Sequence, residues 1–285
     1  MHDPVRTVVR KVWHAGSASE SARVIPEETA LALTYNGGTY AVMMGTPRDL
    51  EDFAIGFSLN EGIIQCLDDI ESLDVVSLDE GIELRMWLAQ SKADRLSERR
   101  RHIAGPTGCG ICGIDSIAEA VRPAAIVAAG GSFSPQQVTA AIQSIPALQA
   151  INVATRAVHA AAFWTRAAGI VALREDVGRH NALDKLAGVL ARQKIAAGDG
   201  MVLLTSRVSV EMVQKTAAMG APLMVAVSAP TALAVRMADA AGITLAAIAR
   251  ADGFEVFTHP GRIAAEIAPQ AAAVQGTAQG AANVA

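Results

Sequence analysis

The chain has 285 residues and a mass of 29.5 kDa, enough for one large or two medium domains that each bury a core. Its formal net charge of −4 and pI near 5.9 exclude a global attraction to nucleic acid or to an anionic membrane surface. Three cysteines with one close pair do not make a disulfide framework, so we expect a reducing, cytoplasmic location.

No segment reads as an export signal or a membrane span. The N-terminal MHDPVRTVVRKVWHAG has scattered charges and lacks the apolar core of a secretory signal. The longest apolar tract, 221–235, contains Pro222, Ser228 and Pro230 and is shorter than the roughly 18 residues that a span needs. At the other end, residues 266–285 are mostly Ala, Gln and Gly, and we expect a disordered tail there.

The first hundred residues predict a small α+β domain, 1–100. Strands are expected at 30–35 and 39–44, joined by the turn sequence Asn36-Gly37-Gly38. A helix should follow, with Thr46 as N-cap and Pro47 at its first position, and should end near Gly62. Apolar residues then alternate with polar ones over 82–88, the period of a half-buried strand.

Residues 91–108 break this pattern with a run of basic side chains, so a basic linker and a cysteine loop are expected over 101–124. An α/β domain is expected over 125–265. It opens with a capping box at Ser134 and a helix whose Val138, Ala141, Ile142 and Ile145 share one face.

From residue 160 onward, predicted strands and helices alternate. A hairpin is expected over 160–173, strands over 201–205, 223–228 and 244–249, and helices over 181–193, 209–219 and 231–241. Such alternation predicts an α/β fold with a partly parallel sheet and helices on its faces.

The stretch that points most clearly to a chemical function is GPTGCGICG, residues 105–113. In it, two residues separate Cys109 from Cys112, and glycines flank both cysteines. Such a pair can share a metal, cycle as a disulfide or pass sulfur between its thiolates. Glycine on both sides of each sulfur frees the backbone and removes shielding side chains. Two buried, inert cysteines fit poorly, because no apolar strand or helix pattern runs through the segment.

Four uses of the thiol pair compete. A tetrahedral zinc site wants four ligands, and the only other cysteine is the distant Cys66. A zinc deaminase would need HxE and PCxxC motifs, which the sequence lacks. A thioredoxin-like pair normally follows a strand in an early βαβ unit, unlike this one. Sulfur relay asks only for an accessible cysteine of low pKa, which the loop offers.

Polar residues also gather where strands are expected to end and helices to begin, the crevice in which α/β sheets usually bind ligands. Helix N-termini there could hold a phosphate or pyrophosphate, although Asp, Asn and Ser at such positions are also ordinary caps. The one GxGxxG match, GCGICG at 108–113, belongs to the cysteine loop, and GxxxxGK[ST] is absent from the sequence, so neither a Rossmann nor a Walker nucleotide site is supported. The three clusters are Arg174 to Asn181, Thr205-Ser206-Arg207, and Ile248 to Gly253.

Two histidines have open roles. His180 could act as a base, orient a ligand, or serve as a hydrogen-bond partner at the start of its helix, and the sequence favours the last. His102, beside Arg99 to Arg101, either favours a thiolate at Cys109 or lies on a solvated linker helix. Asp115 starts a predicted short helix, whose N-terminus would also favour a thiolate at Cys112.

Taken together, these segments resemble the formate dehydrogenase accessory sulfurtransferases, the FdhD family, from about Tyr40 through Ile263. The resemblance rests on five motifs in matching order and on the TPRDLEDFAIGFSLNEGII helix. The motifs are GPTGCGICG, REDVGRHNALDKL, TSRVSVEMVQKTAAMGAP, VSAPTALAV and FTHPGRI.

The resemblance implies a sulfurtransferase that takes sulfur from a cysteine desulfurase as a persulfide. It would deliver that sulfur to the bis(molybdopterin guanine dinucleotide) molybdenum cofactor of formate dehydrogenase. Cys109 would carry the persulfide and Cys112 would be its partner in relay or release. The resemblance also implies a C-terminal domain folded like cytidine deaminases, a homodimer, and binding of GDP as a mimic of the cofactor.

The family's cofactor-binding stretch falls on Ile248, Ala249, Arg250, Ala251, Asp252 and Gly253. Family members often carry an aromatic residue and a proline there, whereas this chain has Ile and Ala. Arg250 keeps the positive charge that a diphosphate needs. Ser206 and Arg207 are further candidate cofactor ligands, and no metal ligand is assigned. The alternative function is a non-covalent carrier that inserts the molybdenum cofactor without a sulfur-transfer step.

Overall fold

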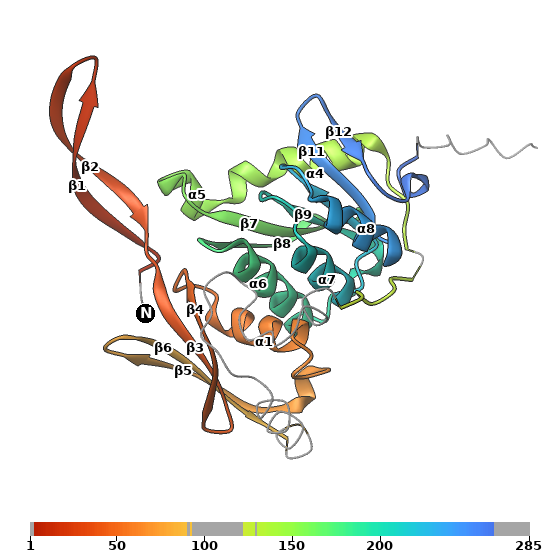
Figure 1. The fold of residues 1–285 in the computed structure, drawn as a ribbon, viewed down its shortest axis with the longest axis horizontal. Helices are drawn as coiled ribbons and strands as arrows, with labels where there is room; N and C mark the ends of the chain where they lie inside the picture. The colour runs from red at the N-terminus through yellow and green to blue at the C-terminus, as the bar shows by residue number, and fades with distance from the viewer. Residues whose placement is uncertain (1–2, 90–91, 93–121, 129, 265–285) are drawn as a thin grey trace, which may run out of the picture.

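A computed structural model describes residues 3–89, 92, 122–128 and 130–264. The described chain has three sheets, with strand orders β1-β2, β4-β3-β6-β5 and β12-β11-β10-β9-β7-β8. Helices cover the two larger sheets, so the protein has a mixed α/β fold (Figure 1). No helix within the described ranges combines the length and hydropathy needed to cross a bilayer.

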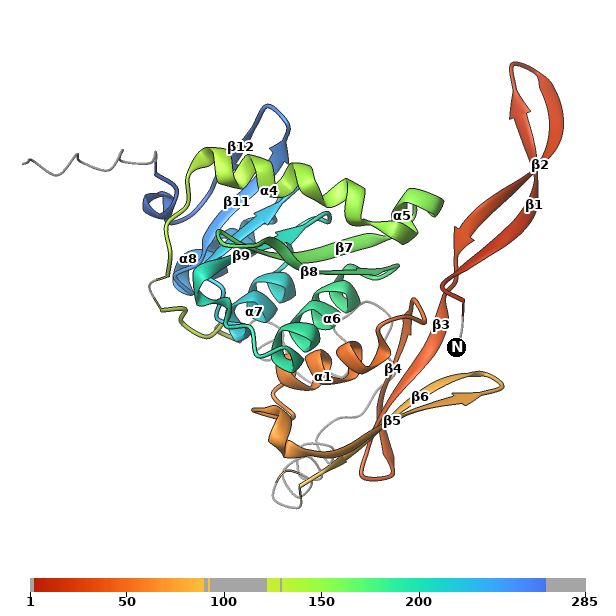
Figure 2. The same ribbon diagram turned by 180° about the vertical axis from the view of Figure 1, so that it is seen from behind.

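The chain begins with a ribbon of two long antiparallel strands, β1 (Val5–His14) and β2 (Ser17–Pro26). This ribbon, here called the arm, projects from the rest of the molecule in both ribbon views (Figures 1 and 2). One attachment to the body is the Arg23 guanidinium, which donates to the Thr155 carbonyl at 3.4 Å. The arm was not predicted, because no strand was expected before residue 30.

The next unit is a four-stranded sheet with one helix on its inner face. Its strands are β3 (Thr29–Tyr35), β4 (Gly38–Gly45), β5 (Ile70–Leu78) and β6 (Gly81–Leu88), and its helix is α1 (Leu50–Asn60). Leu31, Leu33 and Tyr35 alternate toward Phe53 and Phe57 of α1, because successive side chains of a strand point to opposite faces. The alternation expected over 82–88 is confirmed in β6, whereas β5 was missed.

The predicted start of α1 was wrong. The helix begins at Leu50 behind Asp49, which has a left-handed backbone with φ of 53°. Thr46 does not cap it, because its polar atoms are used elsewhere: its N–H donates to Asp176 Oδ2 at 3.0 Å and its Oγ1 accepts from the Val177 N–H at 3.1 Å. A tertiary contact has therefore overridden a local capping signal.

The larger sheet has six strands and carries helices on both faces (Figure 1). Strands β9, β10 and β11 run parallel, while β7, β8 and β12 add antiparallel pairs. Its strands are β7 (His159–Thr165), β8 (Gly169–Asp176), β9 (Gly200–Leu204), β10 (Leu223–Ala226), β11 (Thr244–Arg250) and β12 (Gly253–Val256). The partly parallel sheet expected from strand and helix alternation is confirmed.

The helices of this unit are divided between the two sheet faces. One core joins the sheet to α6 (Arg179–Arg192), α7 (Val210–Ala218) and α8 (Ala232–Ala240). The opposite core joins it to α4 (Pro135–Leu148), which is followed by α5 (Ala150–Thr155). The capping box is confirmed, since Ser134 Oγ accepts from the Gln137 N–H at 3.2 Å and Gln137 Oε1 accepts from the Ser134 N–H at 2.9 Å. Short 3₁₀ turns lie at Leu67–Asp69, Ala197–Asp199 and Pro260–Arg262.

The two larger units meet where α1 crosses α6 at a pair of glycines. A Cβ on Gly56 would lie 1.7 Å from the Asp184 carbonyl oxygen, and a Cβ on Gly188 would lie 1.9 Å from that of Asp52. Only glycine permits backbones to approach so closely. The buried Asp52 carboxylate also bridges the units, because it accepts from Arg174 Nε and from Arg192 Nη1, each at 2.8 Å.

Candidate functional site

Three parallel strands end at one edge of the six-stranded sheet, and the residues after them line that edge. Thr205 follows β9, Val227 follows β10, and Ile248 to Gly253 close β11. Backbone hydrogen bonds hold the three ends together: the Val227 N–H donates to the Leu204 carbonyl at 2.8 Å, and the Ile248 N–H donates to that of Ser228 at 3.4 Å. The carboxyl edge of parallel strands is where α/β sheets bind ligands, and we call this region the edge crevice.

The stretch assigned to cofactor binding is the tight connection from β11 to β12. Arg250 pairs with Gly253 across it, and the intervening Ala251 and Asp252 are exposed. Arg250 Nη1 donates to the carbonyls of Val227 and Ala249. The guanidinium is thus fixed at the edge crevice by backbone oxygens while the residue stays exposed.

Ile248 has an unusual backbone conformation in this connection. Its φ is 53°, although β-branched residues rarely adopt a left-handed backbone. The register of the β11–β12 pair shifts between Ala247 and Arg250, so the strain coincides with a bulge. Such strain costs on the order of 1–3 kcal/mol and tends to occur at ligand-binding segments.

Ser206 and Arg207 lie between β9 and α7, on the same edge. Ser206 is only 3 % exposed and its hydroxyl donates to the Arg207 carbonyl at 3.1 Å, so that donor is already in use. The Arg207 residue is exposed, and its guanidinium has no partner within the described part of the chain. Arg207 is therefore the member of this pair that offers a free charge to a ligand.

The starts of α6 and α7 meet beside Arg207. His180 Nε2, on α6, lies 3.3 Å from Glu211 Oε2, on α7, and the Ser209 hydroxyl donates to the same oxygen at 2.7 Å. The nearby His180 imidazole and Ser209 hydroxyl lower the pKa of Glu211 to about 2 against the opposing effect of burial. The helix-start contact expected for His180 is made to Glu211, in the first turn of α7, and not within its own helix α6.

One buried donor at the start of α6 lacks an acceptor. Arg179 Nε is shielded from solvent without a hydrogen-bond partner in the described ranges. His159, at the start of β7, lies close enough that burial and then the Arg179 charge lower its pKa. An unpaired buried donor is costly, so the Arg179 guanidinium here fits an anionic group such as a phosphate.

The rest of the cluster from Arg174 to Asn181 is structural. The buried carboxylate of Asp176 accepts from Lys185 Nζ at 2.6 Å, the Gly178 N–H at 2.7 Å and Asn181 Nδ2 at 3.0 Å. Arg174 donates to Asp52, as described above. These residues tie β8, α6 and the Thr46 segment together and leave no free donor for a ligand.

Cys109 and Cys112 lie outside the described residues, and Cys66 is an exposed free cysteine. The described residues that flank the range containing the pair are held near one another: Lys92 Nζ donates to Gln65 Oε1 at 2.9 Å, and Arg122 Nη2 donates to the Asn60 carbonyl at 3.4 Å. Within the described ranges, no group of three or more His, Cys, Asp or Glu side chains is placed to hold a metal ion.

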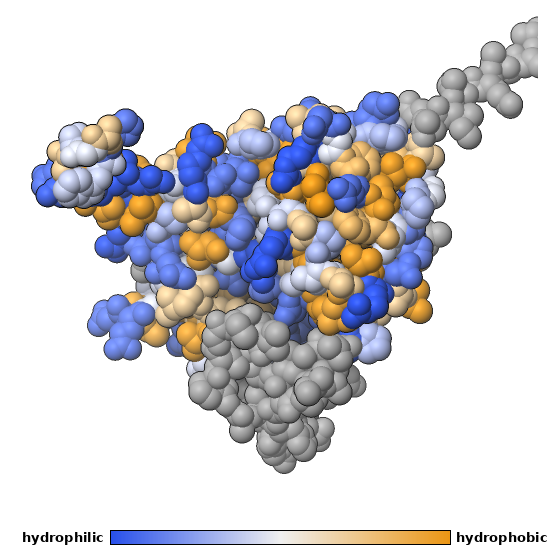
Figure 3. Space-filling view, turned by 45° about the horizontal axis from the view of Figure 1, so that its top comes forward, coloured by the Kyte–Doolittle hydropathy of each residue, from blue (hydrophilic) through white to orange (hydrophobic). Residues whose placement is uncertain are grey.

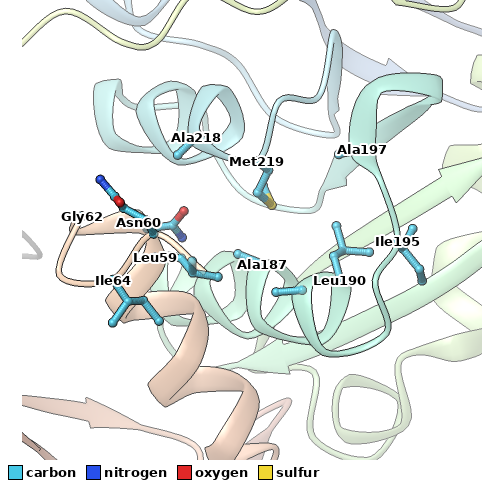
Figure 4. A pocket seen from close by; sticks show the side chains of 12 residues that line it. Leu59, Asn60, Gly62, Ile64, Ala187, Leu190, Ile195, Ala197, Ala218 and Met219 are labelled. Atoms are coloured by element: carbon cyan, nitrogen blue, oxygen red, sulfur yellow. The ribbon is translucent and has the colours of Figure 1, made fainter. Parts of the chain in front are cut away.

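Gln65 and Asn60 also line a pocket of about 420 Å³ between α1, α6 and α7 (Figure 4). Its wall is mainly apolar and includes Leu59, Leu190 and Met219. Met219 follows the carboxyl end of α7, whereas Glu211 is in its first turn. The pocket and the edge crevice therefore lie at opposite ends of α7.

Arg179 was included in the predicted cluster Arg174 to Asn181, whereas no site role was predicted for Ser209 or Glu211. The motifs GRHN and SRVSVEM contained these residues, but a helix-start Arg or Ser is usually solvated or a cap. The missing information was that α6 and α7 begin side by side, which only the fold supplies. The useful signal would have been two polar helix starts that each follow a strand running in the same direction.

The fold and the edge crevice define an α/β protein with an anion-compatible site at the carboxyl edge of a mixed sheet. The model of the FdhD/NarQ family matches residues 26–264, and the chain belongs to this family.

Two relatives are each called sulfur carrier protein FdhD. The protein of Agrobacterium fabrum is 49% identical over 259 residues, covering 90% of this chain and 96% of the relative. That of Brucella abortus is 53% identical over 245 residues, covering 86% and 91%. A crystal structure from Desulfotalea psychrophila, described as a formate dehydrogenase accessory protein, superposes with a TM-score of 0.71 at 22% identity, covering 92% of this chain and all of that one. This last likeness supports the fold.

Proposed function

We propose that the protein is a sulfurtransferase that loads a persulfide on Cys109 and delivers its sulfur to the molybdenum cofactor of formate dehydrogenase. The observation that carries the proposal is membership of a family whose close relatives are named sulfur carriers, in a chain that keeps a glycine-flanked thiol pair. The protein acts in the cytoplasm, with a cysteine desulfurase as donor and as a homodimer.

In the loading step, the Cys109 thiolate attacks the outer sulfur of the donor's persulfide. A new S–S bond forms on Cys109, the donor's S–S bond breaks, and the donor cysteine leaves as a thiolate. Cys112 acts in relay or release: its thiolate can attack the inner sulfur of Cys109, which frees the outer sulfur as sulfide and leaves a disulfide. The two thiols then supply the two electrons that reduce the sulfur.

The molybdenum cofactor, as substrate, docks in the edge crevice. Arg207 and Arg250 face the diphosphate of its guanine dinucleotide part, and the remainder of the Ile248 to Gly253 stretch forms the wall beside it. Support comes from the unpaired Arg207 guanidinium, the strained backbone of Ile248 and the unpaired Nε donor of Arg179. All of these lie at the edge where the fold leaves helix N-termini open to an anion.

Mass spectrometry tests the loading step. After incubation with a cysteine desulfurase and cysteine, the peptide containing Cys109 should gain about 32 Da, one sulfur. Cys109→Ala should abolish the gain, whereas the matched control Cys66→Ala, which removes an exposed cysteine, should keep it. Loading that survives Cys109→Ala would refute the assignment.

Calorimetric titration with GDP tests the docking step. Arg207→Gln and Arg250→Gln should each weaken GDP by about tenfold, because each removes a charge-assisted contact worth roughly 1.5–3 kcal/mol. Lys194→Gln, an exposed change after the far end of α6, should leave affinity unchanged. If all three variants bound GDP as tightly as the wild type, the edge crevice would be excluded as the docking site.

A cellular assay separates the sulfurtransferase from the alternative, a non-covalent cofactor carrier. The Cys109→Ala, Cys112→Ala double variant should fail to support formate dehydrogenase activity while it still binds GDP. Full activity with this variant would favour the carrier, because the carrier needs no thiol.

A further inference from the structure

Exposed apolar residues occur at many places on the described chain, and most need no ligand. On the face shown in Figure 3, hydrophobic residues lie interspersed with hydrophilic ones, as is common on protein surfaces. The pocket between α1, α6 and α7 is different, because its apolar wall surrounds a volume of about 420 Å³ (Figure 4). Pockets that bind small molecules usually have volumes of about 300–1,000 Å³ and an apolar wall with a few polar groups.

Small side chains create this pocket. Ala187 and Ala191 lie one turn apart on α6, and Ala218 is the last residue of α7, so the space between these helices is left unfilled. Apart from a glycine and two amide residues, every lining residue is Ala, Leu, Ile or Met. Side chains around an unfilled space lose packing contacts, which an apolar ligand would restore.

One polar atom in this wall lacks a hydrogen-bond partner. Asn60, the last residue of α1, is 7% exposed and lines the pocket (Figure 4). Its Nδ2 donates to Asp184 Oδ1 at 2.7 Å, whereas its Oδ1 is buried and accepts no hydrogen bond within the described residues. Because a buried acceptor without a donor is costly, the wall needs a donor at this point.

The neighbouring charges determine which atom of the Asn60 amide is left free. Lys215 Nζ donates to both carboxylate oxygens of Asp184, each at 2.6 Å. An ionised carboxylate can only accept hydrogen bonds, so the Asn60 nitrogen must face it. Turning the amide round would place its oxygen against the Asp184 carboxylate. The free atom is therefore the oxygen, and a ligand must supply the donor.

The surroundings of the pocket favour a small molecule over a protein partner. Gln65 on the α1 side and Gln193, Lys194 and Asp199 on the α6 side are all exposed, so the rim is hydrophilic. The core of a protein interface needs a continuous apolar patch, which such a rim does not extend. The lining residues include no charged side chain, so the ligand should be uncharged.

We propose that this pocket binds a small, uncharged apolar molecule with one N–H or O–H donor, which hydrogen-bonds to Asn60 Oδ1. The apolar part of the ligand fills the space beside the alanines of α6 and α7, and the donor satisfies the buried amide oxygen. The pocket and the edge crevice lie at opposite ends of α7, so this inference does not rest on the proposed function.

Methionine methyl resonances test the site, because Met219 lines the pocket. In protein labelled with carbon-13 at its methionine methyl groups, indole, an apolar molecule with one N–H, should shift the Met219 resonance saturably. A Met219→Leu variant assigns that resonance. Benzothiophene has nearly the same shape but no donor, so it should bind at least about tenfold more weakly, because Asn60 Oδ1 then stays unpaired.

Three variants locate the binding. Ala191→Leu fills the pocket and should abolish binding of both molecules, whereas the control Ala140→Leu, an exposed change on α4, should leave binding unchanged. Asn60→Leu should remove the preference for indole over benzothiophene, because it removes the acceptor. Circular dichroism of each variant should match the wild type, and Ala191→Leu keeps the test decisive if Asn60→Leu does not fold.

An unshifted Met219 resonance, equal affinities of the wild type for indole and benzothiophene, or indole binding that survives Ala191→Leu would each overturn the proposal. Equally tight binding of N-acetyltryptophanamide would also overturn it, because the occupant would then be a tryptophan side chain of another protein. GDP titration of Ala191→Leu should match the wild type, since the edge crevice lies at the other end of α7. The outcome at this pocket is thus distinguishable from that of the proposed function.

Discussion

Gly56 of α1 lies directly against Gly188 of α6: a Cβ on Gly56 would come within 2.7 Å of the Gly188 backbone nitrogen. Through this contact the four-stranded unit packs against the six-stranded unit, with the backbones of the two helices in direct contact. The ion pairs of Asp52 with Arg174 and Arg192 join the same two units. The edge crevice begins at the amino-terminal end of α6. The crossing therefore also fixes the position of the helix that contributes to the site.

Gly188→Ala should destabilise the protein by at least about 2 kcal/mol, because the added methyl would overlap the Asp52 carbonyl and force the helices apart. Urea unfolding monitored by circular dichroism measures the change. Gly198→Ala is the matched control, since its Cβ would meet nothing within 4 Å. Equal midpoints for the two variants would mean that α1 and α6 do not pack as described.

Asp176→Asn should cost about 3–5 kcal/mol, because it leaves the fully buried Lys185 ammonium without its counter-charge. Adding Lys185→Met should recover much of the loss, since an apolar side chain then fills the site without a charge. Thermal unfolding of the single and double variants measures both effects. A double variant that is less stable than Asp176→Asn alone would contradict the pairing.

Glu211→Gln should lower stability at neutral pH by an amount that shrinks in acid. The pKa of Glu211 is about 2 in the folded protein, below its ordinary value of 4.5. Its carboxylate therefore stabilises the fold above about pH 4.5, and this contribution is lost as the pH falls toward 2. Urea unfolding of wild type and variant at pH 7, 5 and 3 gives the difference at each pH, and a difference that grows in acid would contradict the contact with His180.

Ile248→Gly should cost less than about 1 kcal/mol, although it removes a partly buried side chain, because glycine accepts a φ of 53° without strain. Ile243→Gly, at a fully buried position with an ordinary backbone, should cost more than about 3 kcal/mol. Chemical unfolding compares the two. Similar losses would show that Ile248 stores no strain.

Most strands and helices from Ser134 onward could be predicted from sequence because their signals are local: a capping box, apolar helix stripes and short apolar runs such as β9 and β10; α5 and β12 were not predicted. The arm could not, because β1 and β2 have no core side to impose alternating burial. The site was predicted in part. Arg207 and the Ile248 to Gly253 stretch lie at the edge crevice, whereas Glu211 matters through its distance to His180, which depends on how α6 and α7 pack. The assignment of these residues to the cofactor stays a prediction.

The α1–α6 crossing has a practical consequence for the chain between Lys92 and Arg122. The two units on either side of it are joined by packed glycines and by the carboxylate of Asp52, quite apart from the covalent link. A single backbone cut within that stretch should therefore yield two fragments that co-purify. Split versions expressed from two plasmids should then assemble, so that the cysteine-bearing peptide can be exchanged, labelled or made synthetically on either half.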